Sequence, residues 1–427
     1  MNPALRAAYA SAGTLAEWAA SAVTEGDGKT MASLAGRHGV LERFARWSAV
    51  HRDQARTLVW LHAPSVGEGL QAQPVIELLR AHRPDVQVVY THFSSSAASF
   101  ASRVGADYAD YLPFDTARAA RDMLQALRPT ALVFSKLDVW PLLVEAAARR
   151  GVGVALIAAT LAEGSARRGL FARALLRDAY AALAAVGAID EADAERLVAL
   201  GVNRAHVRVT GDTRYDQVWA RAQGVDRSSA LLAPLASDRP TLVAGSTWPA
   251  DEQVLEDAWR MVRARMPRAR LIVAPHEPTA EHLGALEAWA VRDTLRLARL
   301  GAYDAGTADV VIVDRVGVLG ELYALADVAY VGGGFHSAGL HSVIEPAAFG
   351  APVLFGPRCT ESRDAGLLIA AHGGRRVDGP ETLGSAVAEW LSSQVTGAAV
   401  GARARELVRG NLGAAARSLE LVLSLLR

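Results

Sequence analysis

The stretch Ala326–Glu345, ADVAYVGGGFHSAGLHSVIE, decides the fold, because it reads as a strand, a glycine turn and a helix in succession. Four consecutive apolar residues, Val328–Val331, are typical of a strand in a parallel sheet that is covered on both faces. Three adjacent glycines then let the backbone turn sharply, and Glu345 falls in the first turn of the helix. Such a turn either directs backbone N–H groups at a phosphate or is a plain tight corner.

Composition limits the possible classes of protein. A chain of 427 residues is long enough for two domains, each with its own core. Lys+Arg and Asp+Glu both number 45, so no overall basic charge is available to recruit nucleic acid. The single cysteine, Cys359, excludes an intrachain disulfide and fits a reducing compartment.

Residues 1–50 form an N-terminal helical segment that is a candidate peripheral membrane anchor. The apolar run Ala7–Val23 contains Glu17 and is shorter than the roughly 20 residues that a membrane-spanning helix needs. The following helix, Val40–Val50, has one apolar face with basic residues beside it, which suits an anionic membrane surface. The face consists of Val40, Leu41, Phe44 and Trp47, and the basic residues are Arg37, Arg43 and Arg46. An ordinary helix packed on the first domain is the alternative.

The first domain, residues 51–220, begins with a strand at Thr57–Ala63, a turn of small residues and a helix that extends to Arg83. In doubly wound sheets, ligands bind beyond the carboxyl ends of such strands. Glu68 lies in this turn between two glycines. Its carboxylate can cap the helix N-terminus, or it can act as a general base, and local sequence leaves both roles open.

The same alternation of strand and helix continues through both halves of the chain. Further strands are expected at Val86–Thr91, Tyr111–Asp115, Leu132–Phe134, Val154–Ala158, Val186–Ile189, Val207–Val209, Thr241–Ala244, Leu271–Ala274, Val310–Val313 and Val353–Phe355. The polar stretch 221–240 breaks the rhythm and marks a linker, so the second domain is expected at 221–427. The pattern predicts an α/β protein with two Rossmann-like domains facing across a cleft, and a last helix, Leu412–Leu426, that packs back on the first domain.

With its turns in this order, the chain from Thr57 to its C-terminus resembles the Kdo (3-deoxy-D-manno-oct-2-ulosonic acid) transferases of lipopolysaccharide assembly. The motifs that carry the resemblance are His62–Glu68, Pro113–Asp115, Trp140-Pro141, Gly211–Asp216, Gly245–Thr247, His276–Pro278, Gly320–Tyr323 and the run from Ala326 through His341 to Glu345. The resemblance implies the GT-B architecture, a CMP-Kdo donor, a lipid A precursor as acceptor, inversion at the anomeric carbon, and no required metal or other cofactor. It also implies a peripheral position on the cytoplasmic side of the inner membrane.

The resemblance also implies roles for individual residues. Glu68 matches the catalytic glutamate. Acceptor-side candidates are Ser65, Lys136, Asp138 and Trp140, although core packing is the favoured alternative for Trp140. Donor-binding candidates are Arg214, Ser246, Thr247, His276, Glu277, Gly332, Gly333, Gly334, His341, Ser342 and Glu345. Among these, the Glu345 carboxylate suits the ribose hydroxyls, and Arg214 and His276 suit the phosphate, unless Arg214 only pairs with its neighbouring aspartates and His276 only caps a turn.

Three stretches depart from the family pattern. Where the family has Glu-x-Glu-x-Trp-Pro, this chain has Lys136-Leu137-Asp138-Val139-Trp140-Pro141, and Ala158–Ala162 replaces Asn-Ala-Arg-Leu-Ser. The late His-Asn pair reads His341-Ser342. Because two of these changes lie on the acceptor side, three alternatives stay open: a transferase of another nucleotide sugar, a nucleotide-sugar epimerase, or a catalytically silent nucleotide-sugar-binding protein. Retention of Glu68 favours an enzyme.

Overall fold

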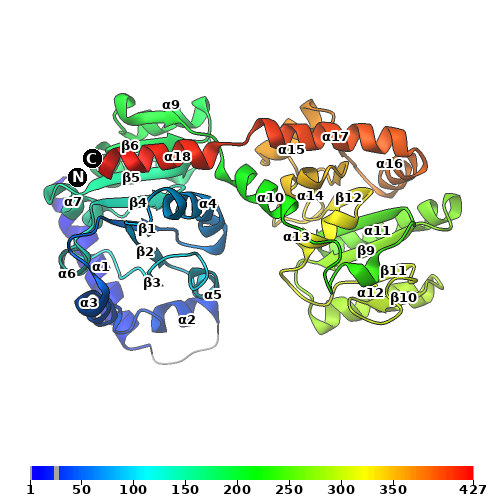
Figure 1. Cartoon of the computed structure of the whole chain (residues 1–427), viewed down its shortest axis with the longest axis horizontal. Coiled ribbons are helices and arrows are strands. Elements are labelled where there is room, and N and C mark those ends of the chain that lie inside the picture. Colours follow the sequence, from blue (N-terminus) through cyan, green and yellow to red (C-terminus); the bar gives the residue numbers. More distant parts are fainter. Residues whose placement is uncertain (1, 24–27, 427) are drawn as a thin grey trace. The chain divides into compact units, whose positions relative to one another are not determined.

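The computed structural model describes residues 2–23 and 28–426. The chain divides into two compact units (Figure 1). The first unit comprises residues 1–217 and 412–427, and the second comprises residues 218–411. Helix α10 (Thr213–Gln223) carries the chain from the first unit into the second. The change of unit therefore falls within a helix, just before the polar stretch at 221–240.

The first unit is built on a parallel sheet, for which the described residues supply seven strands in the order β3-β2-β1-β4-β5-β6-β7. The strands are β1 (Leu58–His62), β2 (Gln87–His92), β3 (Tyr108–Tyr111), β4 (Ala131–Ser135), β5 (Gly153–Ala159), β6 (Ala185–Ala188) and β7 (Val207–Val209). Every residue of β1, β2 and β4 is buried, because helices cover both faces of the sheet.

Side chains of β1 alternate between two hydrophobic clusters, one on each face of this sheet. Leu58 and Trp60 belong to the cluster that α3 and α6–α9 cover, and Val59 and Leu61 belong to the cluster under α4 and α18. The helices of this unit are α1 (Pro3–Ser21), α2 (Lys29–Ala35), α3 (Val40–His51), α4 (Val66–His82), α5 (Ala98–Ala101), α6 (Ala117–Leu127), α7 (Pro141–Arg149), α8 (Leu170–Ala181), α9 (Glu191–Leu200) and α18 (Ala414–Leu423).

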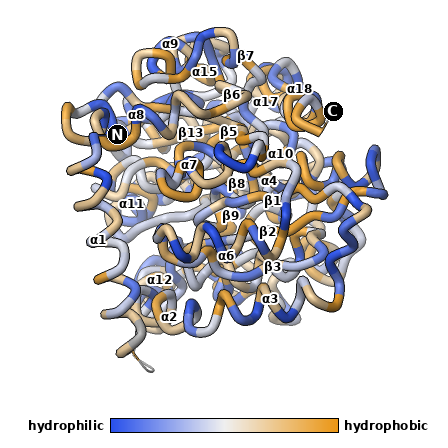
Figure 2. The backbone as a smooth tube through the Cα atoms, turned by 90° about the vertical axis from the view of Figure 1, so that its left-hand side faces the viewer, coloured by the Kyte–Doolittle hydropathy of each residue, from blue (hydrophilic) through white to orange (hydrophobic). Residues whose placement is uncertain are grey.

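The apolar face of α3 packs on the first sheet, so the expectation that this face meets a membrane is wrong. Phe44 is fully buried in the core, and Trp47 stacks on Tyr108 with ring centroids 5.1 Å apart. Arg37 is buried as well and donates to the carbonyl oxygens of Leu112 and Phe93. Residues 24–27 of the expected anchor lie outside the described residues. Within the described ranges, no helix is long and apolar enough to cross a bilayer, and Figure 2 shows α1 alternating between hydrophobic and hydrophilic residues.

The last helix, α18, belongs to the first unit, and the motif Gly211–Asp216 explains how it is held. The Asp216 carboxylate accepts the backbone N–H groups of Gly413 at 2.7 Å and Ala415 at 2.9 Å, at the start of α18. Arg417 donates to the carbonyl oxygen of Thr210 at 2.8 Å. Leu419 adds its buried side chain to the core beside α4. The motif is therefore a structural anchor for the C-terminal helix.

The second unit repeats the design, and its described residues supply seven parallel strands in the order β10-β11-β9-β8-β12-β13-β14. They are β8 (Thr241–Thr247), β9 (Arg270–Pro275), β10 (Leu297–Arg299), β11 (Val310–Ile312), β12 (Val328–Val331), β13 (Val353–Phe355) and β14 (Gly374–Arg376). The helices are α11 (Pro249–Arg265), α12 (Ala280–Arg292), α13 (Leu319–Leu322), α14 (Ile344–Phe349), α15 (Arg363–Ala370), α16 (Pro380–Ser392) and α17 (Gln394–Gly410).

One strand lies at other residues than the sequence predicted. The strand expected at Tyr111–Asp115 lies instead at Tyr108–Tyr111, because Pro113 has no N–H for a sheet and Asp115 has a different task. The buried Asp115 carboxylate accepts the N–H groups of Leu142 and Leu143 at the start of α7, and burial raises its pKa to about 6. It therefore caps a helix instead of extending β3.

Candidate active site

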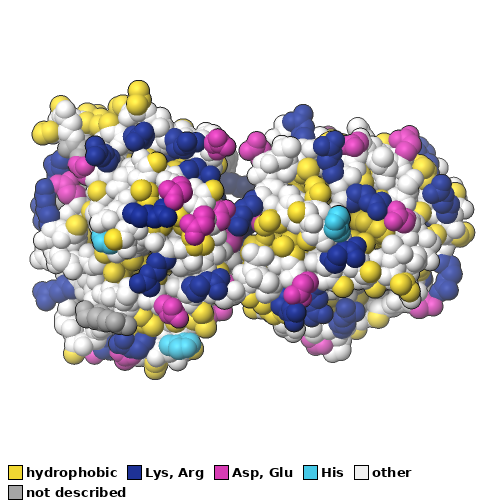
Figure 3. Space-filling view, turned by 90° about the horizontal axis from the view of Figure 1, so that it is seen from above, with side chains coloured by type: hydrophobic (Ala, Val, Ile, Leu, Met, Phe, Trp, Pro, Cys, Tyr) yellow, Lys and Arg dark blue, Asp and Glu magenta, His cyan; other side chains and the backbone are white. Residues whose placement is uncertain are grey.

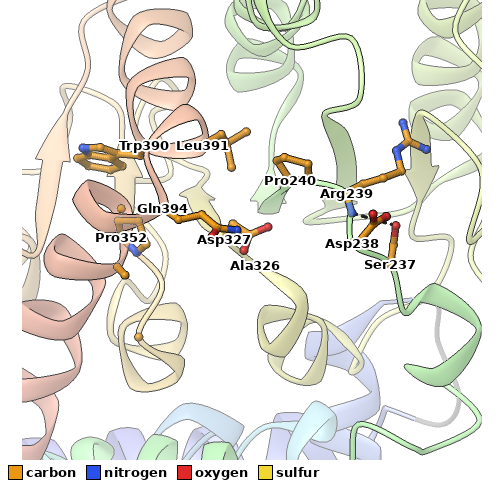
Figure 4. A pocket seen from close by; sticks show the side chains of 13 residues that line it. Ser237, Asp238, Arg239, Pro240, Ala326, Asp327, Pro352, Trp390, Leu391 and Gln394 are labelled. Atoms are coloured by element: carbon orange, nitrogen blue, oxygen red, sulfur yellow. Dashed lines mark hydrogen bonds between the residues drawn. The ribbon is translucent and has the colours of Figure 1, made fainter.

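In both units, the residues expected from the sequence gather where parallel strands end and helices begin, which is the edge where ligands bind in doubly wound sheets. A separate cavity of about 480 Å³ in the second unit lies at the opposite edge of its sheet (Figure 4). Its lining includes Pro240, Asp327 and Pro352, which precede β8, β12 and β13. No site residue expected from the sequence lines this cavity, so it is not the expected donor site.

Glu68 lies in the first turn of α4, and its side chain is 18% exposed. One carboxylate oxygen accepts the Ser65 hydroxyl, and the other lies 3.2 Å from the Lys136 ammonium. Both of these partners are side chains, so Glu68 is not a helix cap of the usual kind, which accepts backbone N–H groups. Gly67 is open to solvent, but a side chain at Gly69 would collide with Phe100, so this glycine serves packing.

Asp138 is held in a network of fixed polar groups beside Lys136. Its carboxylate lies 3.2 Å from the buried His62 ring and accepts the Trp140 indole N–H at 3.1 Å. Arg167 approaches it at 3.6 Å. Burial raises the pKa of Asp138, but the hydrogen bond and charge of His62 and the charge of Arg167 outweigh this and hold it below its ordinary value. Asp138 is therefore a compensated, ionised carboxylate.

Trp140 serves two purposes. Its ring stacks on Phe93 with centroids 5.5 Å apart and packs against the core of the first unit, which agrees with the packing alternative. Its indole N–H holds Asp138 at the same time. The structure therefore ties Trp140 to the acceptor-side cluster through Asp138.

Lys136 has a strained backbone. Its φ of +67° lies in the left-handed region, and its N–H donates to the carbonyl oxygen of Ile157 at 2.9 Å. A non-glycine residue in this region costs roughly 1–2 kcal/mol. An ion pair that is partly exposed, like that of Lys136 with Glu68, contributes only about 0–1 kcal/mol. The ion pair alone therefore does not offset the strain, and such strain is common at functional sites.

In the second unit, Thr247 does not point at a ligand. Its hydroxyl is fully buried and donates to Glu252 at 2.6 Å, and the other Glu252 oxygen lies 2.8 Å from the His282 ring. Helix α11 starts at Pro249, beyond Trp248. The donor-binding candidate Thr247 therefore directs its hydroxyl into the interior, whereas Ser246, with a φ of +54°, is partly exposed at the end of β8.

The first two residues of the triple glycine, Gly332 and Gly333, serve close packing. The N–H of Gly332 donates to the carbonyl oxygen of Gly245 at 2.9 Å, and the N–H of Gly333 donates to Asp251 at 2.8 Å. A Cβ on Gly332 would collide with the backbone of Ser246, and Gly333 has a φ of +90°. Helix α14 begins only at Ile344 and has six residues. The expectation that Gly332 and Gly333 offer free N–H groups is wrong.

Asp251 organises this edge of the second sheet, although its position in the sequence indicates only the first turn of a helix. It is fully buried, and each of its carboxylate oxygens accepts two hydrogen bonds. The four donors are the Tyr330 hydroxyl at 2.9 Å and the N–H groups of Phe335 at 3.1 Å, Trp248 at 3.0 Å and Gly333 at 2.8 Å. One carboxylate thus ties the glycine loop to the loop after β8.

Aromatic and imidazole rings cluster at the same edge. Trp248 is stacked between His276 and His336, with ring centroids 4.7 Å and 4.2 Å away. Its indole N–H donates to Nε2 of His341 at 3.2 Å, so the neutral His341 carries its proton on Nδ1. Nδ1 of His336 accepts the N–H of Ala338, which leaves Nε2 as its donor. Burial, aided by His276, lowers the pKa of His341.

Glu345 offers a carboxylate with spare acceptor capacity. Among the described residues it makes no hydrogen bond or ion pair, and burial raises its pKa while the charge of Arg221 opposes this. Arg221 lies over Gly320, where a side chain would collide with the guanidinium. The motif Gly320–Tyr323 therefore makes room for Arg221 near Glu345, and the sequence alone did not single out Arg221.

The remaining candidates differ in position. Arg214 belongs to the first unit and donates twice to the buried Asp212 carboxylate, which agrees with the ion-pair alternative. Glu277 is exposed, and its carbonyl oxygen lies 2.9 Å from the His282 ring. Ser342 is partly buried next to His341. The structure therefore brings together Ser246, the glycines, the histidines and Glu345 in the second unit, but not Arg214.

Comparison with known proteins shows which proteins this chain resembles. Residues 38–217, most of the first unit, match a family described as 3-deoxy-D-manno-octulosonic-acid transferase (kdotransferase). A 3-deoxy-D-manno-octulosonic acid transferase of Bordetella pertussis is 29% identical over 388 residues, which cover 88% of this chain and 90% of that protein. The enzyme of the same name from Haemophilus influenzae is 24% identical over 373 residues, which cover 85% and 86%. The chain is therefore similar to 3-deoxy-D-manno-octulosonic acid transferases over most of its length.

Solved structures support the fold class. UDP-GlcNAc 2-epimerase from Neisseria meningitidis superposes with a TM-score of 0.63 at 14% identity, covering 86% of this chain and all of that one. A glycosyltransferase from Rickettsia africae gives a TM-score of 0.58 at 10% identity, covering 87% and 99%. At such low identities the likeness concerns the fold alone. The predicted resemblance to Kdo transferases and the prediction of two Rossmann-like domains of the GT-B type are confirmed.

Proposed function

We propose that this protein transfers a Kdo residue from CMP-Kdo to a lipid A-type acceptor, with inversion and with Glu68 as general base. The observation that carries the proposal is the position of Glu68. It is a partly exposed carboxylate at the carboxyl edge of the first sheet, within the residues that match the family. Carboxylates so placed can take a proton from a hydroxyl that lies within hydrogen-bond reach.

The proposed step balances as follows. The acceptor hydroxyl gives its proton to the Glu68 carboxylate, and its oxygen forms a bond to the anomeric carbon of Kdo. The bond from that carbon to the phosphate oxygen breaks, and CMP leaves with the electron pair. Attack and departure on opposite faces of the carbon invert its configuration. Proton removal by a positioned base typically contributes 10²–10⁴-fold to the rate, on the order of 3–5 kcal/mol.

On the donor side, the second unit supplies groups of suitable chemistry. The Glu345 carboxylate has acceptors for the two ribose hydroxyls. The N–H groups at Nε2 of His336 and Nδ1 of His341 can donate hydrogen bonds to the leaving phosphate and stabilise the negative charge that it gains. With the N–H groups of Gly332 and Gly333 already engaged, we assign the phosphate to these imidazoles rather than to the glycine turn.

We further propose that the first unit lies on the cytoplasmic surface of the inner membrane, where its lipid acceptor would be. Two pairs of exposed apolar side chains support this: Leu15 and Trp18 on α1, and Leu170 and Phe171 at the start of α8, which are 87% and 72% exposed. Arg167 and Arg168 precede the second pair, and basic residues add roughly 1 kcal/mol each at an anionic surface. On the face that Figure 3 shows, basic and acidic side chains are otherwise intermixed.

The activity is tested by incubating the full chain with CMP-Kdo and a tetra-acylated lipid A precursor, and by following CMP release and the glycolipid product. Binding is tested by thermal-shift titration with CMP, UMP and AMP, each with and without EDTA. We expect product and a shift selective for CMP. Epimerisation of a UDP-sugar without transfer, or equal responses to all three nucleotides, would contradict the proposal.

Membrane contact is tested by co-sedimentation with vesicles that contain phosphatidylglycerol. The double variant L170S/F171S should lose most of the binding because it removes exposed apolar area. V291S, at an exposed site of α12 in the second unit, is the matched control and should bind normally. Equal binding of the two variants would exclude α8 as the contact.

A further inference from the structure

Lys136 is unusual in this chain. The sequence contains only two lysines, Lys29 and Lys136, among 45 basic residues, so nearly all of its positive charge is carried by arginine. An ammonium is a compact charge with three donors, whereas a guanidinium is a rigid planar fork. At the position next to Glu68, the chain thus has a group that can donate to two different partners at once.

The surroundings leave part of this ammonium available. Its side chain is 43% exposed, and its ammonium lies 3.2 Å from one oxygen of Glu68. The neighbouring carboxylate, Asp138, is already compensated by His62, Trp140 and Arg167, so Lys136 is not required there. With one donor directed at Glu68, two N–H groups of Lys136 can still reach an incoming ligand.

The same contacts leave Glu68 able to accept a further hydrogen bond. Each of its two oxygens has one donor, from Ser65 and from Lys136, and a carboxylate oxygen can accept two hydrogen bonds. A hydroxyl can therefore donate to Glu68 while Lys136 stays beside the same carboxylate. A ligand that binds the other N–H groups of Lys136 would then lie next to the base.

We infer that Lys136 binds an anionic oxygen of the acceptor, from a phosphate or a carboxylate next to the attacking hydroxyl, and thereby places that hydroxyl against Glu68, which takes its proton. This inference rests on the proposed transfer reaction. Lys136 acts as a positioning and specificity residue, because it selects acceptors that carry an anion beside the hydroxyl. The left-handed backbone of Lys136, which glycine would adopt without strain, is then explained by the use of its side chain.

The kinetic test compares Lys136→Gln and Lys136→Arg with the wild type, and Lys29→Gln serves as the matched lysine control. The acceptors are a bisphosphorylated precursor and its dephosphorylated form, and a Kdo-bearing acceptor and its methyl ester. For acceptors that keep the anion, Lys136→Gln should raise KM about 10- to 100-fold with little change in kcat, and Lys136→Arg should recover most of the loss. Wild-type enzyme should prefer the anionic member of a pair, and Lys136→Gln should lose this preference. If the preference is lost for the phosphorylated pair, the ligand of Lys136 is a phosphate, and if it is lost for the Kdo-bearing pair, the ligand is a carboxylate.

A second measurement needs no turnover. Reductive ¹³C-methylation of the full chain labels only Lys29, Lys136 and the N-terminal amine, and the Lys136→Arg variant assigns the signals. Glucosamine 1-phosphate or free Kdo should shift the Lys136 signal, whereas glucosamine and the Kdo methyl ester should not. Equal movement of the Lys29 and Lys136 signals, or an unchanged KM for every acceptor in Lys136→Gln, would overturn the inference. A wild-type protein that forms no product with any acceptor would instead refute the proposed function.

Discussion

Replacing Asp251 by asparagine should selectively destabilise the second unit. The carboxylate is buried and accepts four hydrogen bonds, two at each oxygen. An amide NH₂ fits the space but cannot accept a hydrogen bond, so the asparagine keeps only one of the two acceptor oxygens. In the less costly orientation the NH₂ faces Tyr330, whose hydroxyl can turn to accept, and the N–H of Phe335 loses its partner. An unsatisfied donor costs about 1–3 kcal/mol, and the remaining bonds lose the contribution of the charge.

These terms add up to roughly 3–5 kcal/mol, which is a large part of the 5–15 kcal/mol that usually stabilises a domain. For a unit of this size the melting temperature should fall by about 6–20 °C. Differential scanning calorimetry of the full chain measures this, and titration with CMP reports whether the second unit still binds the nucleotide. Asp257→Asn, on the exposed face of the same helix, is the control and should stay within about 0.5 kcal/mol of the wild type. A melting temperature for Asp251→Asn within about 2 °C of the wild type would refute this account of the loop.

Three further outcomes are expected. Glu68→Gln should lower transfer by about 10²–10⁴-fold at an almost unchanged melting temperature, and normal turnover would exclude it as the base. The pKa of His341 is lowered in the folded state, so the contribution of this residue to stability is present above a pH of about 6.5 and is lost as the pH falls below that value. The Tm of His341→Gln should therefore depend less on pH below about 6.5 than the Tm of the wild type. Asp216→Ala should cost about 1–2 kcal/mol and expose the α18 junction to proteolysis, unlike Asp226→Ala at a fully exposed site.

The sequence predicted most of the fold because the central strands carry continuous apolar runs. The stretch Val328–Val331 forms β12 with the bounds expected, and Val353–Phe355 forms β13. The edge strands β10 and β14 were missed. Each has three residues, and the arginines in Leu297–Arg299 and Gly374–Arg376 hide the apolar pattern on which strand prediction depends.

The candidate site could be predicted less completely, because the same residue types serve ligands and packing. Glu68 lies at the start of a helix, as its turn indicated. The glycines after β12 satisfy close backbone contacts that arise only when three distant loops meet, and no local pattern reveals them. Thr247 donates to the buried Glu252, and Arg214 pairs with the buried Asp212, which its neighbourhood in the sequence offered as the alternative to phosphate binding. His336 and Trp248 become neighbours only through the pairing of β8 with β12, although both follow strand ends.

The return of α18 to the first unit has a consequence for how the chain matures. The second unit is one unbroken stretch, 218–411, inserted into a first unit whose sequence is interrupted. On the ribosome, the second unit can complete its core while the first still lacks the helix that fills the space beside α4. The first unit must therefore wait, with Val75 and Ile76 not yet fully covered, until the last residues are synthesised. A chain truncated before α18 should therefore fail to complete the first unit, although most of that unit lies far upstream of the truncation. The second unit, which ends just before α18, should still fold.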